Sequence, residues 1–250
     1  MNSLYVSATG MTSQQLNIDT ISNNMANINT PGFKRSEINF KDLYYQDIAV
    51  GKGKNISVGL GSKVDGANKV FTQGSLRETG NLLDLAIEGG GFFKVAMGDG
   101  TFGYTRDGSF RMDADGSIVT VSGYRLEPPI TIDQSFSEIA IDLDGLVTLK
   151  PIDSDVVQEI GTIELCDFSN PAGLLSASGN IYKETVASGP EIINNNGTLG
   201  TIRQGFLESA NVNIMEEMTS LIVAQRAFEI NSKAIKAADD MMGITNGIRQ

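Results

Sequence analysis

The C-terminal stretch IMEEMTSLIVAQRAFEINSKAIKAADDMM, residues 214–242, decides the fold, because large apolar side chains recur in it every seven residues. A seven-residue apolar repeat lines one side of a helix and is typical of helices that pack lengthwise against a partner helix. The stretch therefore predicts one long helix that needs a partner. The repeat consists of Ile214, Leu221, Phe228, Ile235 and Met242.

The N-terminal residues 4–28 carry the same period and supply a candidate partner. The pattern predicts a helix that ends near Asn29, because Thr30-Pro31-Gly32 disfavours its continuation. We expect the two terminal helices to pack as a coiled-coil-like pair. The N-terminal repeat consists of Leu4, Met11, Ile18 and Met25, with Ile21 and Ile28 three residues after the last two.

The start and end of the C-terminal helix are indicated by capping residues and glycine. Ser209, Asn211 and Asn213 are all usable N-caps, and the acidic pair at 216–217 falls near the positive end of the helix dipole. The helix can run to about Gly243. It would then be about 45 Å long at 1.5 Å per residue.

The residues between the helices predict β-structure. Residues 31–67 indicate an extended, partly strand-like segment that is too rich in glycine for a long helix. From there on, short apolar runs end in hairpin-type Asp-Gly turns, which predicts antiparallel strands. The expected fold class is α+β, with parts at 1–30, 31–67, 68–200 and 201–250. The predicted turns are Asp99-Gly100, Asp107-Gly108, Asp115-Gly116 and Asp144-Gly145.

Composition excludes several classes of function. The net charge of −11 disfavours nucleic-acid binding, which depends on clustered Lys and Arg. The chain has no apolar run of 18 residues, so we expect no membrane insertion, and the first ten residues lack the positive charge of a secretory signal peptide. Histidine is absent and Cys166 is the single cysteine, so we expect no catalytic residue, metal or cofactor.

The C-terminal helix carries more apolar surface than the N-terminal helix can cover. Burying its five repeat residues contributes about 8–15 kcal/mol, which is comparable to the stability of a whole domain. Val223, Ile230 and Ile244 add apolar surface on further sides of this helix. Two interpretations stay open. The helices form a hairpin packed on the β-domain of the same chain, or copies of the same chain cover the surplus.

Several motifs resemble one protein family along nearly the whole chain. SNNMANINTPGFKR at 22–35 is similar to the N-terminal motif of bacterial flagellar rod and hook proteins, and residues 209–235 are similar to their C-terminal motif. GFFKV at 91–95 and YTRDGSF at 104–110 resemble their globular part. DLYYQ at 42–46, together with YTRDGSF and QRAFEINSK, resembles the distal-rod branch. Residues 47–61 are short for that branch, and a proximal rod or hook-type axial subunit stays as an alternative.

The resemblance implies a non-enzymatic subunit that polymerises helically into the flagellar drive shaft. It also implies contacts with other rod subunits, the hook protein and the ring bushing around the rod. Export would use the flagellar type III apparatus, without a cleaved signal peptide, to a basal body that crosses the periplasm. Two alternatives of other classes are a cell-wall or glycan-binding β-domain with helical oligomerisation ends, and a hydrolase with paired carboxylates.

The assembly surface expected from the resemblance lies mainly on the two repeats. Its apolar part is Leu4, Met11, Ile18, Met25, Ile214, Leu221, Phe228, Ile235 and Met242. Polar specificity between helices is expected from Asn24, Asn27, Gln225, Arg226 and Asn231. Phe33 and Lys34 are expected to anchor the extended segment to a neighbouring subunit.

Overall fold

The structure is a computed structural model that describes residues 2–49, 55–98, 100–132, 136–151, 156–193 and 199–248. The chain divides into two compact units. The helical unit comprises Met1–Ala26, Ser36–Lys69 and Val212–Gln250. The β unit comprises Asn27–Arg35 and Val70–Asn211. The chain therefore passes from one unit to the other four times, and the short segment after the first helix belongs to the β unit.

Two long helices were predicted at the termini, and both are present. Helix α1 spans Asn2–Ala26 and α2 spans Ile214–Ile248. Of the three candidate N-caps, Asn213 caps α2, because its Oδ1 accepts a hydrogen bond from the Met215 N–H at 3.1 Å. The predicted end of α2 near Gly243 is wrong by five residues, because this glycine lies inside the helix and does not end it.

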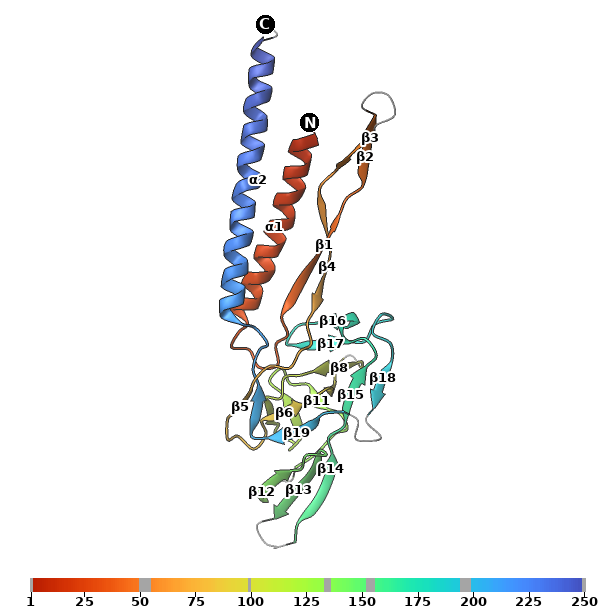
Figure 1. The fold of residues 1–250 in the computed structure, drawn as a ribbon. Coiled ribbons are helices and arrows are strands. Elements are labelled where there is room, and N and C mark those ends of the chain that lie inside the picture. The colour runs from red at the N-terminus through yellow and green to blue at the C-terminus, as the bar shows by residue number, and fades with distance from the viewer. Residues whose placement is uncertain are drawn as a thin grey trace. The chain divides into compact units, whose positions relative to one another are not determined.

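The two helices pack side by side and antiparallel (Figure 1). Asn24, near the end of α1, contacts Glu217 in the first turn of α2. Fourteen residues earlier in α1, Gly10 lies beside Asn231, which is fourteen residues later in α2. This constant register confirms that the two terminal helices pack lengthwise against each other, as predicted.

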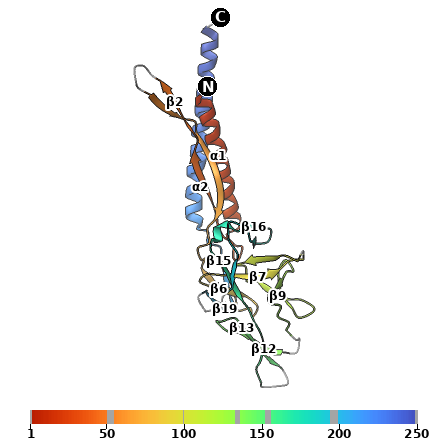
Figure 2. The ribbon, with the colours of Figure 1, turned by 90° about the vertical axis from the view of Figure 1, so that its right-hand side faces the viewer.

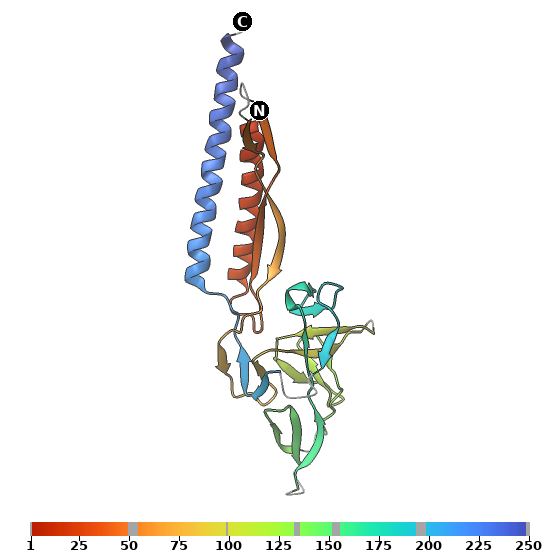
Figure 3. The ribbon, with the colours of Figure 1, turned by 45° about the vertical axis from the view of Figure 1, so that its right-hand side comes forward.

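A long β-excursion formed by residues 36–69 belongs to the helical unit, and its strands β1 and β4 lie along α1, as the views in Figures 1 and 3 show. Strand β1 (Ser36–Asp42) pairs antiparallel with β4 (Ser62–Lys69). Further out, β2 (Tyr45–Ala49) pairs with β3 (Asn55–Gly59). The predicted extended segment is thus a two-stranded ribbon, and part of the short 47–61 loop lies outside the described residues.

The β unit contains antiparallel sheets among its described residues, and Figure 2 shows them from a second side. The main sheet has the order β16-β17-β8-β7-β11-β10-β9, with β15 on β7 and β18 on β15, and β12-β13-β14, β19-β6 and β20-β5 form smaller sheets. A short 3-10 helix of the β unit is η1 (Pro171–Gly173). The strands are β5 (Leu76–Glu78), β6 (Leu85–Glu88), β7 (Phe92–Ala96), β8 (Phe102–Thr105), β9 (Phe110–Met112), β10 (Ile118–Thr120), β11 (Arg125–Leu126), β12 (Phe136–Ile141), β13 (Leu146–Pro151), β14 (Gln158–Thr162), β15 (Leu165–Phe168), β16 (Leu175–Ser176), β17 (Ile181–Lys183), β18 (Glu191–Ile193), β19 (Thr201–Gln204) and β20 (Phe206–Glu208).

The Asp-Gly turns are only partly hairpins. Asp115-Gly116 joins β9 to β10, and Asp144-Gly145 joins β12 to β13, as predicted. The prediction for Asp107-Gly108 is wrong, because it connects β8 to β9, which are not neighbours in the sheet. The remaining predicted turn is Asp99-Gly100, and Asp99 lies outside the described residues.

Gly108 serves close packing and not a turn. A Cβ atom at this position would overlap the carbonyl oxygen of Leu85, whose N–H donates to the Gly108 carbonyl at 3.0 Å. Glycine is the residue that lets two backbones approach this closely. Gly108 is therefore required by a contact between distant parts of the chain. In the sequence, such a glycine cannot be told from the glycine of an Asp-Gly hairpin turn.

Candidate assembly surface

We call the contact between α1 and α2 the seam, and the predicted apolar repeats lie on these two helices. Leu4, Met11, Ile18 and Met25 are partly buried on α1, and so are Leu221, Phe228 and Ile235 on α2. Ile214 and Met242, at the two ends of the α2 repeat, are exposed by 50% and 37%. The side of α2 that faces the seam consists of Glu217, Leu221, Ala224, Phe228, Asn231, Ile235 and Ala238.

Asn24 fixes the end of the seam where α1 ends and α2 begins. Its side chain is 2% exposed. The amide donates to the Ser36 carbonyl oxygen and accepts from the Ser36 N–H, both at 2.9 Å, so it ties α1 to the start of β1. The same Nδ2 lies 3.4 Å from Oε2 of Glu217, a buried carboxylate on α2. One amide thus joins three segments of the helical unit.

The other polar residues expected at the interface lie in different environments. Asn231 faces the seam beside Gly10, whose missing side chain leaves room for the amide. Gln225 and Arg226 are exposed on α2, and the Arg226 guanidinium pairs with Glu229 at 3.1 Å. Asn27 lies in the β unit, where its Oδ1 accepts from the Thr30 hydroxyl at 3.3 Å. The structure therefore brings Asn24 and Asn231 to the seam and leaves Gln225 and Arg226 on the surface.

A second apolar row, which we call the outer stripe, runs along α2 away from α1. It consists of Val223, Ile230, Ala237 and Ile244, again at steps of seven. The three large members are 63%, 64% and 65% exposed. At about 100° per residue, these positions lie about 100° or more around the helix from the seam. An exposed apolar row of this length is typical of an interaction surface.

Phe33 and Lys34 are buried inside the β unit, which corrects the expectation that they contact a neighbouring subunit. Phe33 is 5% exposed and Lys34 is 0% exposed. The Lys34 ammonium donates to Oε1 of Glu208 at 2.6 Å and to the Thr72 carbonyl at 2.8 Å. Burial lowers the pKa of Lys34, and the Glu208 carboxylate opposes that shift.

Glu208 also holds Arg106, so that three charged side chains share one buried site. Nη1 of Arg106 lies 3.3 Å from the Glu208 carboxylate, and Nη2 donates to the Gly89 carbonyl at 2.9 Å. The guanidinium carbon is 5.4 Å from the centre of the Phe92 ring. The N-terminal motif, through Lys34, is thereby fixed to the strand that precedes α2.

Asn211 joins its own segment of the β unit to two others by side-chain hydrogen bonds. Its Oδ1 accepts from the Arg35 N–H at 2.8 Å, and its Nδ2 donates to the Val70 carbonyl at 2.7 Å. The Val70 N–H in turn donates to the Arg35 carbonyl at 2.9 Å. Residues 35, 70 and 211 are three of the four positions at which the chain enters or leaves the β unit. Asn211 therefore holds these three positions together by hydrogen bonds and is not the N-cap of α2.

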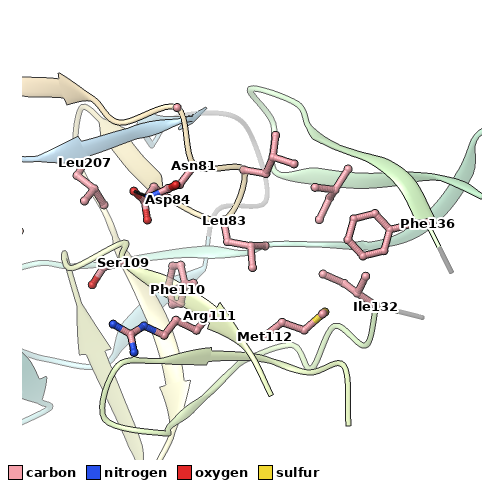
Figure 4. Close-up of a pocket in the computed structure, with 13 residues that line it drawn as sticks. Asn81, Leu83, Asp84, Ser109, Phe110, Arg111, Met112, Ile132, Phe136 and Leu207 are labelled. Carbon is pink, nitrogen blue, oxygen red and sulfur yellow. Dashed lines mark hydrogen bonds between the residues drawn. The ribbon is translucent and has the colours of Figure 1, made fainter. Parts of the chain in front are cut away.

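The β unit also carries an apolar groove of about 740 Å³ (Figure 4). Phe110, Met112 and Ile132 lie along it, and Asp84 is the only carboxylate among the described residues that line it. That carboxylate accepts hydrogen bonds from the Thr79 hydroxyl at 2.6 Å and from the Asn81 amide at 3.0 Å. Among the described residues, the lining of the groove therefore shows one carboxylate and not the pair that the hydrolase hypothesis requires.

Two tyrosines and the cysteine of the β unit, Tyr104, Tyr182 and Cys166, pack in its core. Tyr104 and Tyr182 are 3% and 2% exposed, so neither offers a surface for stacking against a sugar. Burial raises the pKa of Cys166 to about 12 and also raises the pKa of Tyr104, whose hydroxyl donates to Glu191 at 2.7 Å. These groups serve the core of the β unit.

The sequence reasoning missed Glu208, Arg106 and Glu217. Glu217 lies on the row that continues through Ala224, Asn231 and Ala238, and that seven-residue spacing could have placed it in the seam. Glu208 and Arg106 carried no comparable signal, because they are distant in the chain. Among the described residues, neither helix has the length and apolarity needed to cross a membrane.

Three family profiles match this chain in the order expected from the motifs. Residues 4–34 match the flagella basal body rod protein profile, and residues 86–149 match the flagellar hook protein FlgE/F/G D1 domain. Residues 203–248 match the flagellar basal body rod FlgEFG protein C-terminal profile. These matches cover most of both helices and residues 86–149 of the β unit.

Full-length relatives narrow this assignment. The chain is 44% identical to the flagellar basal-body rod protein FlgG of Borreliella burgdorferi, over 100% of this chain and 99% of that protein. It is 42% identical to FlgG of Buchnera aphidicola subsp. Schizaphis graminum, over 96% of both chains, and 40% identical to FlgG of Agrobacterium fabrum, over 98% of both. FlgG is the distal rod protein, which favours the distal rod over the proximal alternative. The chain therefore belongs to the FlgG family and is a structural subunit of the bacterial flagellar basal-body rod.

Proposed function

We propose that this chain polymerises helically and that its paired helices form the wall of the rod, where the outer stripe of α2 is covered by copies of the same chain. The observation that carries the proposal is the exposure of Val223, Ile230 and Ile244, each above 60%, on a helix whose other apolar row is already engaged with α1. Water-exposed apolar rows of this kind are stabilised by burial against another protein surface.

Polymerisation follows if the outer stripe meets a different surface on the neighbouring copy. A contact between two different surfaces that does not close on itself generates an open helical filament. Transmission of torque then depends on rigid packing, because close-packed protein interiors have low compressibility. Inside one subunit, the Asn24 amide and the Lys34–Glu208 pair supply such fixed points.

The same proposal extends to partners and export. Other rod subunits, the hook protein and the ring bushing are the expected neighbours, and the flagellar type III apparatus is the expected export route. The role is non-enzymatic. Before assembly the terminal helices are unfolded, because much of their apolar surface is buried only by neighbours. Circular dichroism tests this last point: full helix content with protease-resistant ends in the purified monomer would show that folding is not deferred.

Motility of cells that carry Val223→Asp in place of the native chain tests the proposed assembly. The charge would have to be buried in the wall, so we expect loss of swimming, while circular dichroism of the purified variant keeps the β signal of the β unit. Lys233→Asp is the matched control. It changes charge more strongly at an exposed position outside the stripe, and we expect swimming to persist.

Normal swimming of the Val223→Asp cells would contradict the proposal. It would favour the alternative in which the two helices form a hairpin that needs no neighbours. Loss of swimming in both variants would also count against the outer stripe, because the effect would then follow from charge anywhere on α2.

A further inference from the structure

A groove in the helical unit lies between α1 and the ribbon formed by β1 and β4. Its volume is about 480 Å³. Ala8, Thr9 and Thr12 form part of its lining on α1, and Leu43 and Val64 line it from the ribbon. Small side chains on the helix make this surface hollow, and larger ones bound it.

The depth of this groove has a local cause. Gly61, at the start of the returning strand, lies against Thr9, and a Cβ atom there would overlap the Thr9 hydroxyl. Its φ of +111° is also in the region that favours glycine. The ribbon can therefore approach α1 closely at one point, and next to that point the small residues of α1 stay open.

The two ends of the groove are marked by exposed apolar side chains on α1. Tyr5 is 57% exposed and Leu16 is 43% exposed. Eleven residues of helix separate them, which is about 16 Å. The groove therefore offers an apolar trough with a large side chain at each end, which suits the face of a helix laid into it.

The outer stripe of α2 has the complementary shape. Its members are seven residues apart, or about 10.5 Å along the helix. A trough of about 16 Å can thus receive two successive members, and Val223 and Ile230 are the two consecutive large ones. Both are β-branched, so their side chains are stiff and project as a fixed ridge. The α2 of the same chain cannot fill the groove, because its own seam already faces α1.

We infer that the outer stripe of one subunit, centred on Ile230, docks into the α1–ribbon groove of the next subunit. This inference rests on the proposed function and adds the identity of the receiving surface. The occupant of the groove is a second copy of this chain, because both halves of the contact lie exposed on one subunit. The two halves are different surfaces, as an open helical assembly requires.

Disulfide trapping between single-cysteine chains tests the contact. One chain carries Thr12→Cys and the other Ile230→Cys, both in a Cys166→Ala background, and the two are co-expressed in the source bacterium without its native copy. After oxidation of isolated basal bodies, we expect a disulfide-linked dimer at least tenfold above the control pair Thr12→Cys with Lys233→Cys. A dimer between two single-cysteine chains can only arise from a contact between subunits.

A second pair, Ala8→Cys with Ile230→Cys, allows for a shift of one helical turn in register. A dimer above control from either pair supports the docking. Basal bodies that contain both chains and give no such dimer from either pair overturn it, although rod assembly itself would stand. Failure of the proposed function is seen separately, as cells in which the unaltered chain restores neither rods nor swimming.

Discussion

The Lys34 ammonium lies 2.6 Å from the Glu208 carboxylate, and neither side chain is exposed. These two residues are 174 positions apart, one in the segment after α1 and the other in the last strand before α2. Two charges buried together are stable only when each is paired and hydrogen-bonded. Within the β unit, the pair thus connects the segment that follows α1 to the strand that precedes α2.

Replacing Lys34 with Met should destabilise the β unit. The substitution keeps most of the side-chain volume but leaves Glu208 with Arg106 as its remaining cationic partner. Breaking a buried pair in this way costs about 3–5 kcal/mol. Urea unfolding followed by the near-ultraviolet signal of the buried tyrosines measures the loss.

The double variant Lys34→Met/Glu208→Leu separates pairing from packing. We expect it to lose less than the sum of the two single variants, because each single variant already removes the Lys34–Glu208 interaction, which the double variant loses only once. Additive losses would show that the two side chains do not interact in the folded protein.

Asn24→Ala should weaken the helical unit. It removes the partners of the Ser36 N–H and carbonyl, and each unsatisfied backbone group costs about 1–3 kcal/mol. Hydrogen exchange in isolated rods should show faster exchange of the Ser36 amide. Asn29→Ala, at an exposed position, is the control. Equal exchange in the two variants would mean that Asn24 does not hold β1 to α1.

Gly108→Ala should destabilise the β unit by about 3 kcal/mol or more, because the added Cβ would overlap the Leu85 carbonyl and force the backbones apart. Gly98→Ala is a matched control, since a Cβ there meets nothing within 4 Å. Thermal unfolding of the two variants measures the difference. A similar melting temperature for both would contradict the close approach at Gly108.

The sequence was sufficient for the helices because their period is local. Residues 221, 228 and 235 specify one side of α2 without reference to the rest of the chain. The burial of polar residues could not be predicted from a local pattern in the same way. Asn24 and Glu217 look like surface residues of separate helices until the antiparallel register brings them to 3.4 Å.

Long-range packing also explains the errors. Lys34 was expected to anchor the extended segment to a neighbouring subunit. A lysine is rarely buried unless it is paired, and here its partner is the distant Glu208. Asp107-Gly108 was predicted to form a hairpin turn because of its dipeptide sequence. Glycine is needed at position 108 because a side chain there would overlap the Leu85 carbonyl. Neither partner could be identified from spacing in the chain.

Stability should fall on the alkaline side because of buried neutral acids. Burial raises the pKa of Cys166 from an ordinary value of 9.0 to about 12, and it raises the pKa of Tyr104 and Tyr182 as well. The unfolded chain loses these protons first, so their contribution is complete below pH 9 and declines between about pH 9 and 12. Cys166 alone accounts for about 1.4 kcal/mol per pH unit in that window.

Urea unfolding at a series of pH values checks this dependence. Cys166→Ala should show a shallower decline above pH 9 than the unaltered chain. Identical slopes for the two proteins would contradict the assignment to the thiol.

Electron cryo-microscopy of the assembled rod tests most directly whether the paired terminal helices are the assembly surface. The account predicts that α1 and α2 line the inner wall, with Val223, Ile230 and Ile244 covered by neighbouring subunits. A rod in which these three side chains face solvent, and in which subunits meet only through their β units, would contradict it.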